Sequence, residues 1–409
     1  MIPRMPTRRA ALPALALVLL AACSRDAQQG LPSASATPSA TSPSPTPTPT
    51  PSATAKPKPT STPTAKPTPK PTSTSSIPPA TGPAPAHFTP VDFSFLGHSV
   101  GWALGKHCPG ECGPVMARTT DQGRTWHQST VPAGTSASPD VANAISRVRF
   151  GNLENGWVFG PALHATHDGG KTWRAVDLGG EVWTLEEAKS TTWAIVKGCA
   201  AGGCRFYLYV AAQDSDAFAQ RAVLPYAGEG TLQLVRHEGS TAWIATKGPS
   251  VPRLWRTTNA GYSWTEVADP CAAFGDGSDQ FLSRVDASRV WMLCSADAGA
   301  GSQTKYVFHS TDGGRHWGSR SEGPRSGLAV DFVALSAQTA LLSTTHGGLR
   351  RTTNGGITWS TVAPDCCDAG FGKIESVNSY DVWAIGVGAN AIFRSGDRGA
   401  SWASYGFRA

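Results

Sequence analysis

Long apolar runs are scarce in this chain of 409 residues, which argues against a helical membrane protein. The longest run, Ala10 to Leu20, has about eleven residues, too few to cross a bilayer as a permanent helix. Convincing amphipathic helical patterns are missing as well, whereas short segments with period-two alternation recur along the chain. Any membrane attachment would therefore have to come from lipid.

Dense basic segments are missing from most of the chain. The net charge is +6, but eight Lys and Arg residues stand against Asp26 alone before residue 88, which gives that part +7. The remaining residues therefore carry −1, and nucleic-acid binding loses its main electrostatic support. Paired Cys-x-x-Cys spacings are also missing, so we expect neither a metal site nor a cofactor.

The N-terminus has the pattern of an export signal. Three arginines precede the apolar run, which ends in Leu20-Ala21-Ala22-Cys23. This tetrapeptide resembles a bacterial lipobox, in which the cysteine is lipidated and becomes the mature N-terminus. We expect residues 1–22 to be a lipoprotein signal peptide and Cys23 to carry the lipid. An ordinary signal peptide is the alternative, and the pair Arg8-Arg9 leaves both general and twin-arginine export open.

Residues 23–87 are predicted to be a disordered linker. From about residue 31 they are almost entirely Pro, Ser, Thr, Ala and Lys. Such a segment has no apolar side chains to bury and favours an extended, polyproline-like conformation. It would reach on the order of 150 Å, enough to hold a folded domain well away from a membrane.

A recurring octapeptide, Ser/Thr-x-Asp-x-Gly-x-x-Trp, organises the rest of the chain. It occurs six times; Asn replaces Asp in two copies, while Gly and Trp are present in all six. The third, fifth and eighth residues of the copies are Asp121, Gly123 and Trp126; Asp168, Gly170 and Trp173; Asn259, Gly261 and Trp264; Asp312, Gly314 and Trp317; Asn354, Gly356 and Trp359; and Asp397, Gly399 and Trp402.

The chemistry of this octapeptide suits a tight turn between two strands. Its carboxylate or amide can accept backbone N–H bonds, and its glycine permits a positive φ. Its tryptophan starts the next strand with a large apolar side chain. A cation or ligand site is the alternative, but the exchange of Asp for Asn favours a self-satisfied structural turn.

Seven units of roughly 46 residues fill residues 88–409. Each unit has an alternating apolar strand (A) and then a strand (B) with a central Trp, as in Gly156-Trp157-Val158. Strand C leads into the octapeptide and strand D starts at its Trp. One step between octapeptides is 91 residues, so a seventh copy is lost near Gln213 to Gln220. One four-stranded antiparallel blade per unit predicts an all-β, seven-bladed β-propeller, with the manner of ring closure left open.

Eight cysteines follow Cys23, and an even number in an exported chain indicates disulfides. Two pairs have the spacing of locally closed loops, a third flanks strands A and B of one unit, and two adjacent cysteines would form a vicinal bridge or cross-pair. The residues are Cys108 and Cys112; Cys199 and Cys204; Cys271 and Cys294; and Cys366 and Cys367.

The predicted strand order places all eight cysteines in B–C or D–A connections. In a four-stranded blade these connections emerge on one face, and the octapeptides, in C–D connections, lie on the other. Rigid, crosslinked loops on a scaffold are suited to binding, so we expect the binding surface on the cysteine-bearing face.

The octapeptides resemble the Asp-box (BNR) repeats of the sialidase superfamily of β-propellers, over about 322 residues. With the lipobox and the Gly-Trp-Ala pattern, the chain is most similar to the photosystem II stability/assembly factor family and its bacterial relatives. This resemblance implies a non-enzymatic role: binding a partner protein, often a membrane protein, during assembly. We expect the partner to be a membrane or cell-envelope protein, and the chain to be a monomer anchored to the membrane by lipid.

Two alternatives to a protein-binding scaffold remain. An exo-sialidase or related glycoside hydrolase would need an Arg-Ile-Pro motif, three arginines and a Tyr/Glu pair. No Arg-Ile-Pro occurs, and Arg149, Arg236 and Arg284 are more simply read as blade-packing residues. Glu186 and Glu187 are adjacent on a strand and would point to opposite faces. The second alternative is a wall-polysaccharide binder without hydrolysis.

Overall fold

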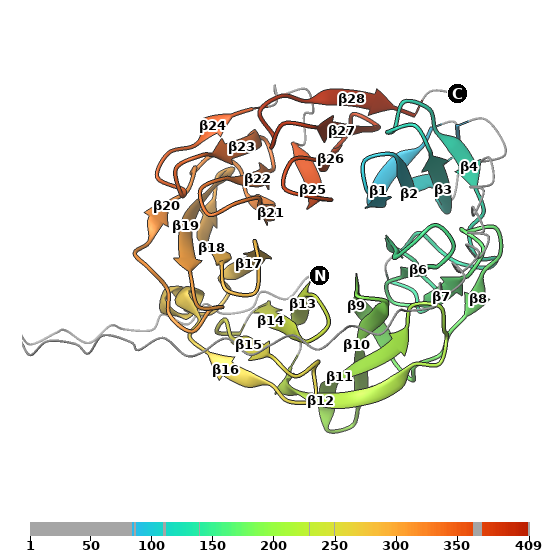
Figure 1. Cartoon of the computed structure of the whole chain (residues 1–409), viewed down its shortest axis with the longest axis horizontal. Coiled ribbons are helices and arrows are strands. Elements are labelled where there is room, and N and C mark those ends of the chain that lie inside the picture. The colour runs from blue at the N-terminus through green and yellow to red at the C-terminus, as the bar shows by residue number, and fades with distance from the viewer. Residues whose placement is uncertain are drawn as a thin grey trace, which may run out of the picture. The chain divides into compact units, whose positions relative to one another are not determined.

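The computed structural model describes residues 84–85, 87–108, 112–138, 140–228, 230–248, 250–362 and 370–407. The strands in this part of the chain form seven four-stranded antiparallel sheets arranged as blades around a central channel (Figure 1). The predicted seven-bladed β-propeller is therefore confirmed. The signal peptide, Cys23 and nearly all of the linker lie outside the described residues.

Each blade consists of four strands that follow one another in the sequence. Blade 1 contains β1 (Thr89–Leu96), β2 (Val100–His107), β3 (Gly113–Thr119) and β4 (His127–Ser129); blade 2 contains β5 (Arg147–Phe150), β6 (Gly156–Phe159), β7 (Leu163–Thr166) and β8 (Arg174–Ala175); blade 3 contains β9 (Glu181–Ala188), β10 (Thr191–Ala200), β11 (Gly203–Ala212) and β12 (Ala219–Ala227); blade 4 contains β13 (Thr231–His237), β14 (Thr241–Lys247), β15 (Leu254–Thr257) and β16 (Thr265–Val267).

After the short 3-10 helix η1 (Pro270–Phe274), blade 5 contains β17 (Asp279–Arg284), β18 (Val290–Gly299), β19 (Ser302–Ser310) and β20 (Ser321–Glu322); blade 6 contains β21 (Ala329–Ala334), β22 (Ala340–Thr344), β23 (Gly348–Thr352) and β24 (Ser360–Thr361); blade 7 contains β25 (Phe371–Ser376), β26 (Val382–Gly386), β27 (Ala391–Ser395) and β28 (Ala403–Gly406). No helix in the described ranges is both long enough and apolar enough to cross a membrane.

The ring closes by packing, because every sheet in the described chain is built from strands of a single blade. Seven buried apolar clusters lie between adjacent blades, one at each junction. At the junction of the last and first blades, Phe95 stacks on Trp383 with ring centroids 3.7 Å apart, and Phe407 packs against Phe88. Apolar packing thus joins the last blade to the first, as it joins every other pair of adjacent blades.

The B-strand tryptophans are the centres of these clusters. Six blades carry one, each no more than 1% exposed, and Leu341 takes the place in blade 6. In several blades a C-strand cation covers the ring, as Arg118 covers Trp102 at 5.2 Å. A buried indole N–H needs an acceptor, and Trp102 and Trp243 donate to the Asp-box carbonyls of the next blade, Gly169 O and Gly313 O.

Each Asp-box is a turn whose first and third residues hydrogen-bond within the turn. In the first copy, Thr119 Oγ1 donates to Asp121 Oδ1 at 2.9 Å and accepts from Gly123 N, and Thr125 N donates to the same carboxylate. The other five copies repeat all three bonds. The Asp-box thus serves as a local frame for the C–D turn.

The hydroxyl at the seventh Asp-box position explains why Asn can replace Asp. Thr125 Oγ1 donates to Asp121 Oδ2 at 2.6 Å, whereas Asn259 Nδ2 donates to Ser263 Oγ at 2.9 Å. A hydroxyl is both donor and acceptor, so it reverses its role when an amide stands opposite.

The fifth-position glycine of the Asp-box allows the turn to touch the preceding blade. Gly261 has φ +82°, and a Cβ there would lie 2.4 Å from Leu208 Cδ2 and 3.1 Å from the Trp193 ring, both in blade 3. Only glycine combines this backbone conformation with such close approach. The Asp-box is therefore also a contact between blades.

Blade 3 is the one that lacks an Asp-box, as the spacing predicts. Its β11–β12 connection instead supplies Asp216, whose carboxylate lies 2.8 Å from His167 Nε2 and accepts from Arg174 Nη1 at 3.2 Å. Both partners belong to blade 2. A charged contact thus joins the blades where the seventh copy of the motif is lost.

Candidate functional site

Three disulfides tie down connections on one face of the propeller. Cys108 pairs with Cys112 and Cys199 with Cys204, each closing a B–C connection, and Cys271 in the D–A connection of blade 5 pairs with Cys294. We call the face bearing the B–C and D–A connections the cysteine-loop face, and the opposite one the Asp-box face. Cys366 and Cys367 lie outside the described residues.

Three cysteines do not lie in connections, contrary to the sequence prediction. Cys199 and Cys204 lie in the paired ends of β10 and β11, and Cys294 is a fully buried residue within β18. Strand β18 has ten residues and ends at Gly299, so Cys294 lies well before the B–C turn of blade 5. The disulfide therefore pins the D–A connection to the middle of a core strand.

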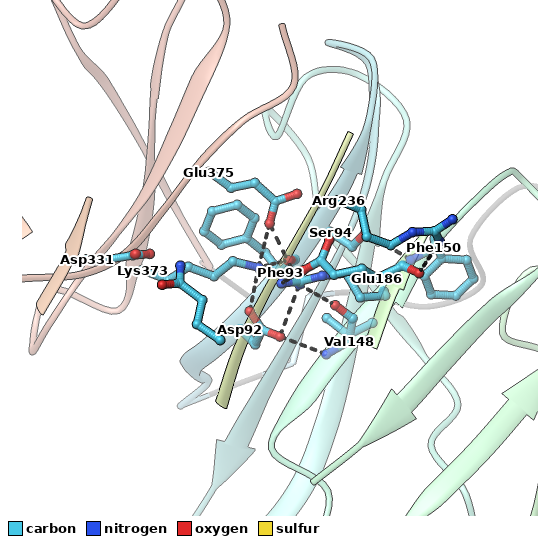
Figure 2. Close-up of polar contacts among 12 residues, drawn as sticks. Asp92, Phe93, Ser94, Val148, Phe150, Glu186, Arg236, Asp331, Lys373 and Glu375 are labelled. Carbon is cyan, nitrogen blue, oxygen red and sulfur yellow. Dashed lines mark hydrogen bonds and ion pairs between the residues drawn. The ribbon is translucent and has the colours of Figure 1, made fainter. Parts of the chain in front are cut away.

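A network of charged side chains in the channel links four blades that follow one another around the ring (Figure 2). Lys373 Nζ lies 2.7 Å from Asp92 Oδ1 and 2.6 Å from Glu375 Oε2. Arg149 Nη1 lies 3.5 Å from Asp92 and 3.7 Å from Glu375, and its Nη2 lies 4.0 Å from Glu186. The network joins blades 1, 2, 3 and 7. Nowhere in the described chain do three His, Cys, Asp or Glu side chains form a group able to hold a metal.

Four of these charges come from two positions on the inner A strands. Arg149, Glu186 and Glu375 each stand opposite the B-strand tryptophan of their own blade, and Asp92 is one alternation earlier on its strand. Because side chains alternate along a strand, both positions share one side of the A strand. The register thus gathers residues into the channel that no local motif connects.

Polar A-strand side chains also accept hydrogen bonds from backbone N–H groups on the inner A strand of the neighbouring blade. Val148 N donates to Asp92 Oδ2 at 2.8 Å, Leu282 N to Gln233 Oε1 at 2.9 Å, and Ile374 N to Asp331 Oδ2 at 3.0 Å. An unpaired strand edge needs such partners wherever water is restricted. In each case the acceptor belongs to the preceding blade, so these side chains hold the ring together.

Burial and pairing shift the pKa values of the network in opposite directions. Burial acts to raise the pKa of Asp92, but the Lys373 ammonium and the Arg149 guanidinium outweigh it and lower that pKa. Burial raises the pKa of Glu186 and of Asp331, because neither has a closely paired cation. The Asp92 carboxylate, which two cations contact, is thus held ionised.

The two other channel arginines named from the sequence hold blades together. Arg236 Nη1 donates to Glu186 O at 3.0 Å and Thr191 O at 2.8 Å of blade 3, and its guanidinium covers Trp193 at 4.2 Å. Arg284 Nε donates to Arg236 O of the preceding blade. Both residues line the channel cavity of 550 Å³.

Glu187 stands apart from the ion pairs, although it lines the same cavity as Glu186. Burial raises its pKa to about 8, against the lowering effect of the hydrogen bond donated by Thr192 Oγ1. At neutral pH this carboxyl is therefore mostly protonated.

The channel cavity opens toward the Asp-box face, because its lining includes the A–B connection residues Val285, Asn378 and Ser379. A separate concavity lies on the cysteine-loop face between blades 2 and 3. Here two adjoining cavities of 490 Å³ and 320 Å³ share Pro161, Glu181 and Val182. We call these two cavities together the blade 2–3 groove.

Sequence reasoning missed both the channel network and the groove. Asp92, Lys373 and Glu375 carry no motif, and only the register of the A strands against the B-strand tryptophans could have indicated them. The groove follows from a difference in strand length: β6 and β7 have four residues each, whereas β10 and β11 have ten.

No protein-family model matches the chain. No curated protein matches it either. Among solved structures, YCF48 bound to a D1 peptide is 19% identical, with 75% of this chain and 92% of that chain covered and a TM-score of 0.55. YCF48 from Cyanidioschyzon merolae is 15% identical over 77% of this chain and 97% of that one, with a TM-score of 0.53. At these identities the likeness shows the fold alone, and the predicted β-propeller fold is confirmed.

Proposed function

We propose that this chain is a non-catalytic, protein-binding propeller that works outside the cytoplasm, anchored to the membrane by lipid on Cys23. The observation that carries the proposal is the blade 2–3 groove, an open concavity on the face whose loops are crosslinked. Surface concavities positioned by a rigid scaffold are the usual sites of recognition.

The distribution of charge supports binding over catalysis. The paired channel residues Asp92, Arg149, Lys373 and Glu375 are occupied with one another and with backbone groups of neighbouring blades. A solved propeller of similar fold, YCF48, is bound to a peptide, which supports a peptide ligand here by analogy of fold.

Crosslinking in cells, followed by identification of the captured partner, tests this proposal. The expected product is a covalent adduct with a membrane or cell-envelope protein. Retention on peptidoglycan without any protein adduct would instead support a wall-polysaccharide binder and would contradict the proposal.

The location has a test of its own. Replacing Cys23 with Ala removes the proposed lipid site, so the variant is expected to lose labelling by a radioactive fatty acid and to leave the membrane fraction. Unchanged labelling and fractionation would contradict lipid anchoring.

A glycoside hydrolase acting in the channel is the second candidate, favoured by Glu187. A carboxyl with its pKa raised to about 8 by burial, set in a cavity, is able to serve as a general acid. The test is turnover of a fluorogenic sialoside. Turnover that is abolished by Glu187→Gln or by substitution of Arg284 would replace the binding proposal with this one.

A further inference from the structure

The blade 2–3 groove has an apolar interior. It is lined by Val141 and Ala142 from the β4–β5 connection, by Pro161 and Leu163 of blade 2, and by Val182 of blade 3. Val141 is 41% exposed, so its aliphatic side chain is accessible to a partner. Apolar surface in a concavity gains free energy when a partner covers it.

Carboxylates dominate the rim of the groove. Asp140, Asp177 and Glu181 are exposed side chains along its lining, against the single guanidinium of Arg147. His164 does not offset them, because burial lowers its pKa. Lys197 Nζ lies 5.4 Å from the centroid of the Trp183 ring at one end of the groove. With Lys197 included, the three carboxylates still outnumber the two cations.

The groove is formed before any ligand arrives. Val182 N donates to Pro161 O at 2.9 Å, which ties blade 3 to the B–C turn of blade 2. Strand β9, which supplies Glu181 and Val182 to the lining, pairs with β10. A disulfide between Cys199 and Cys204 joins β10 to β11. A rigid wall lowers the ordering cost of binding.

We propose that the blade 2–3 groove binds an extended segment of a partner protein, with apolar side chains in the groove and lysine or arginine residues flanking them. This rests on the proposed protein-binding function and names the chemistry of the bound segment. The acidic rim favours lysine or arginine at the two ends of the bound segment, because opposite charges attract. The apolar lining favours apolar side chains at the centre of the segment.

Fluorescence anisotropy with the purified chain tests the proposal. The probe is an eight-residue peptide with a central pair of leucines and two lysines at each end. Its matched controls carry glutamate in place of lysine, or serine in place of leucine. The lysine–leucine probe is expected to bind, and both controls are expected to bind far more weakly.

Two sets of variants place the binding in the groove. The double variant Asp140→Asn/Glu181→Gln removes two exposed charges and is expected to weaken binding about fivefold. Val141→Ser is expected to weaken it without changing its salt dependence. Asp214→Asn, an exposed carboxylate in the β11–β12 connection on the Asp-box face, is the matched control and should leave binding unchanged.

Three results would overturn the inference. The first is that the glutamate probe binds as tightly as the lysine–leucine probe, and the second is that no probe binds at millimolar concentration. The third is that Asp214→Asn weakens binding as much as Asp140→Asn/Glu181→Gln does. Binding of soluble peptidoglycan fragments that Asp140→Asn/Glu181→Gln weakens, while the peptide does not bind, would overturn it as well. A protein adduct found in cells alongside a negative peptide result would leave the protein-binding function standing and reject only the proposed segment chemistry.

Discussion

The two faces of this propeller are built from the same blades but use their connections differently. On the Asp-box face, six C–D turns repeat one set of hydrogen bonds within the turn. On the cysteine-loop face, connections range from the short Gly160-Pro161 turn to the long segment between β4 and β5. The repeated face is the frame, and the irregular face carries the open groove.

The charged network lies in the channel between the two faces. Disrupting this network should produce the largest fall in the free energy of unfolding. Asp92→Asn leaves the Lys373 ammonium and the Arg149 guanidinium short of a carboxylate, and we expect the free energy of unfolding to fall by about 3 kcal/mol. Urea unfolding measures it, with Asp214→Asn as the control. A change no larger than in that control would contradict the role assigned to the network.

The pH dependence of this variant sharpens the test. The folded pKa of Asp92 is below its ordinary value of 3.8, so its contribution is complete above that pH and is lost as the pH falls through the lower folded pKa. The wild-type chain should therefore lose more stability on acidification than Asp92→Asn does. Parallel acid profiles would argue against the assignment.

Glycines on the two faces should differ in their tolerance of a side chain. Gly261→Ala, in an Asp-box, combines a positive φ with a contact to Leu208 and should cost about 3 kcal/mol. Gly134→Ala, on the cysteine-loop face, has φ +74° but open space around it, and should cost about 1 kcal/mol. Equal losses in thermal unfolding would show that the Asp-box does not act as a contact between blades.

Glu187 should be a source of instability at alkaline pH. Its folded pKa of about 8 is above the ordinary value of 4.5, so its stabilising effect is present at low pH and is lost as the pH rises through 8. Glu187→Gln is expected to be more stable than wild type at pH 9 and nearly equal to it at pH 5. Denaturant midpoints at the two pH values decide this, and a constant difference would refute it.

The Asp-box acid should matter least, and its replacement by Asn hardly at all. Asp397→Ala removes the acceptor for Ser401 N and should cost about 1 kcal/mol, whereas Asp397→Asn should be close to neutral, as Asn259 and Asn354 indicate. Burial acts to raise the pKa of Asp397, but hydrogen bonds from Ser401 and Ser395 lower it to about 2. If the Asn variant were as unstable as the Ala variant, the hydroxyl at the seventh Asp-box position would not exchange its donor and acceptor roles as we infer.

Sequence reasoning succeeded where a signal repeats and failed where each blade contributes one residue. The Gly-Trp strands and the Asp-boxes recur at nearly constant spacing, so the number of blades and the lost seventh copy could be predicted. Asp92 and Lys373 are 281 positions apart and meet only because the ring closes, so no local pattern could reveal their contact. The positions of Cys199, Cys204 and Cys294 were missed because β10, β11 and β18 have ten residues each and run past the short apolar pattern that marks a strand in the sequence.

The most direct test of the central claim compares the two faces in living cells. A photo-crosslinking residue is placed at Val141 in the groove or at Ile357 on the Asp-box face; both are exposed aliphatic positions, 41% and 72% accessible. We predict a covalent adduct with a protein from position 141 and none from position 357. Adducts of equal yield from both positions, or from position 357 alone, would contradict the assignment of binding to the cysteine-loop face.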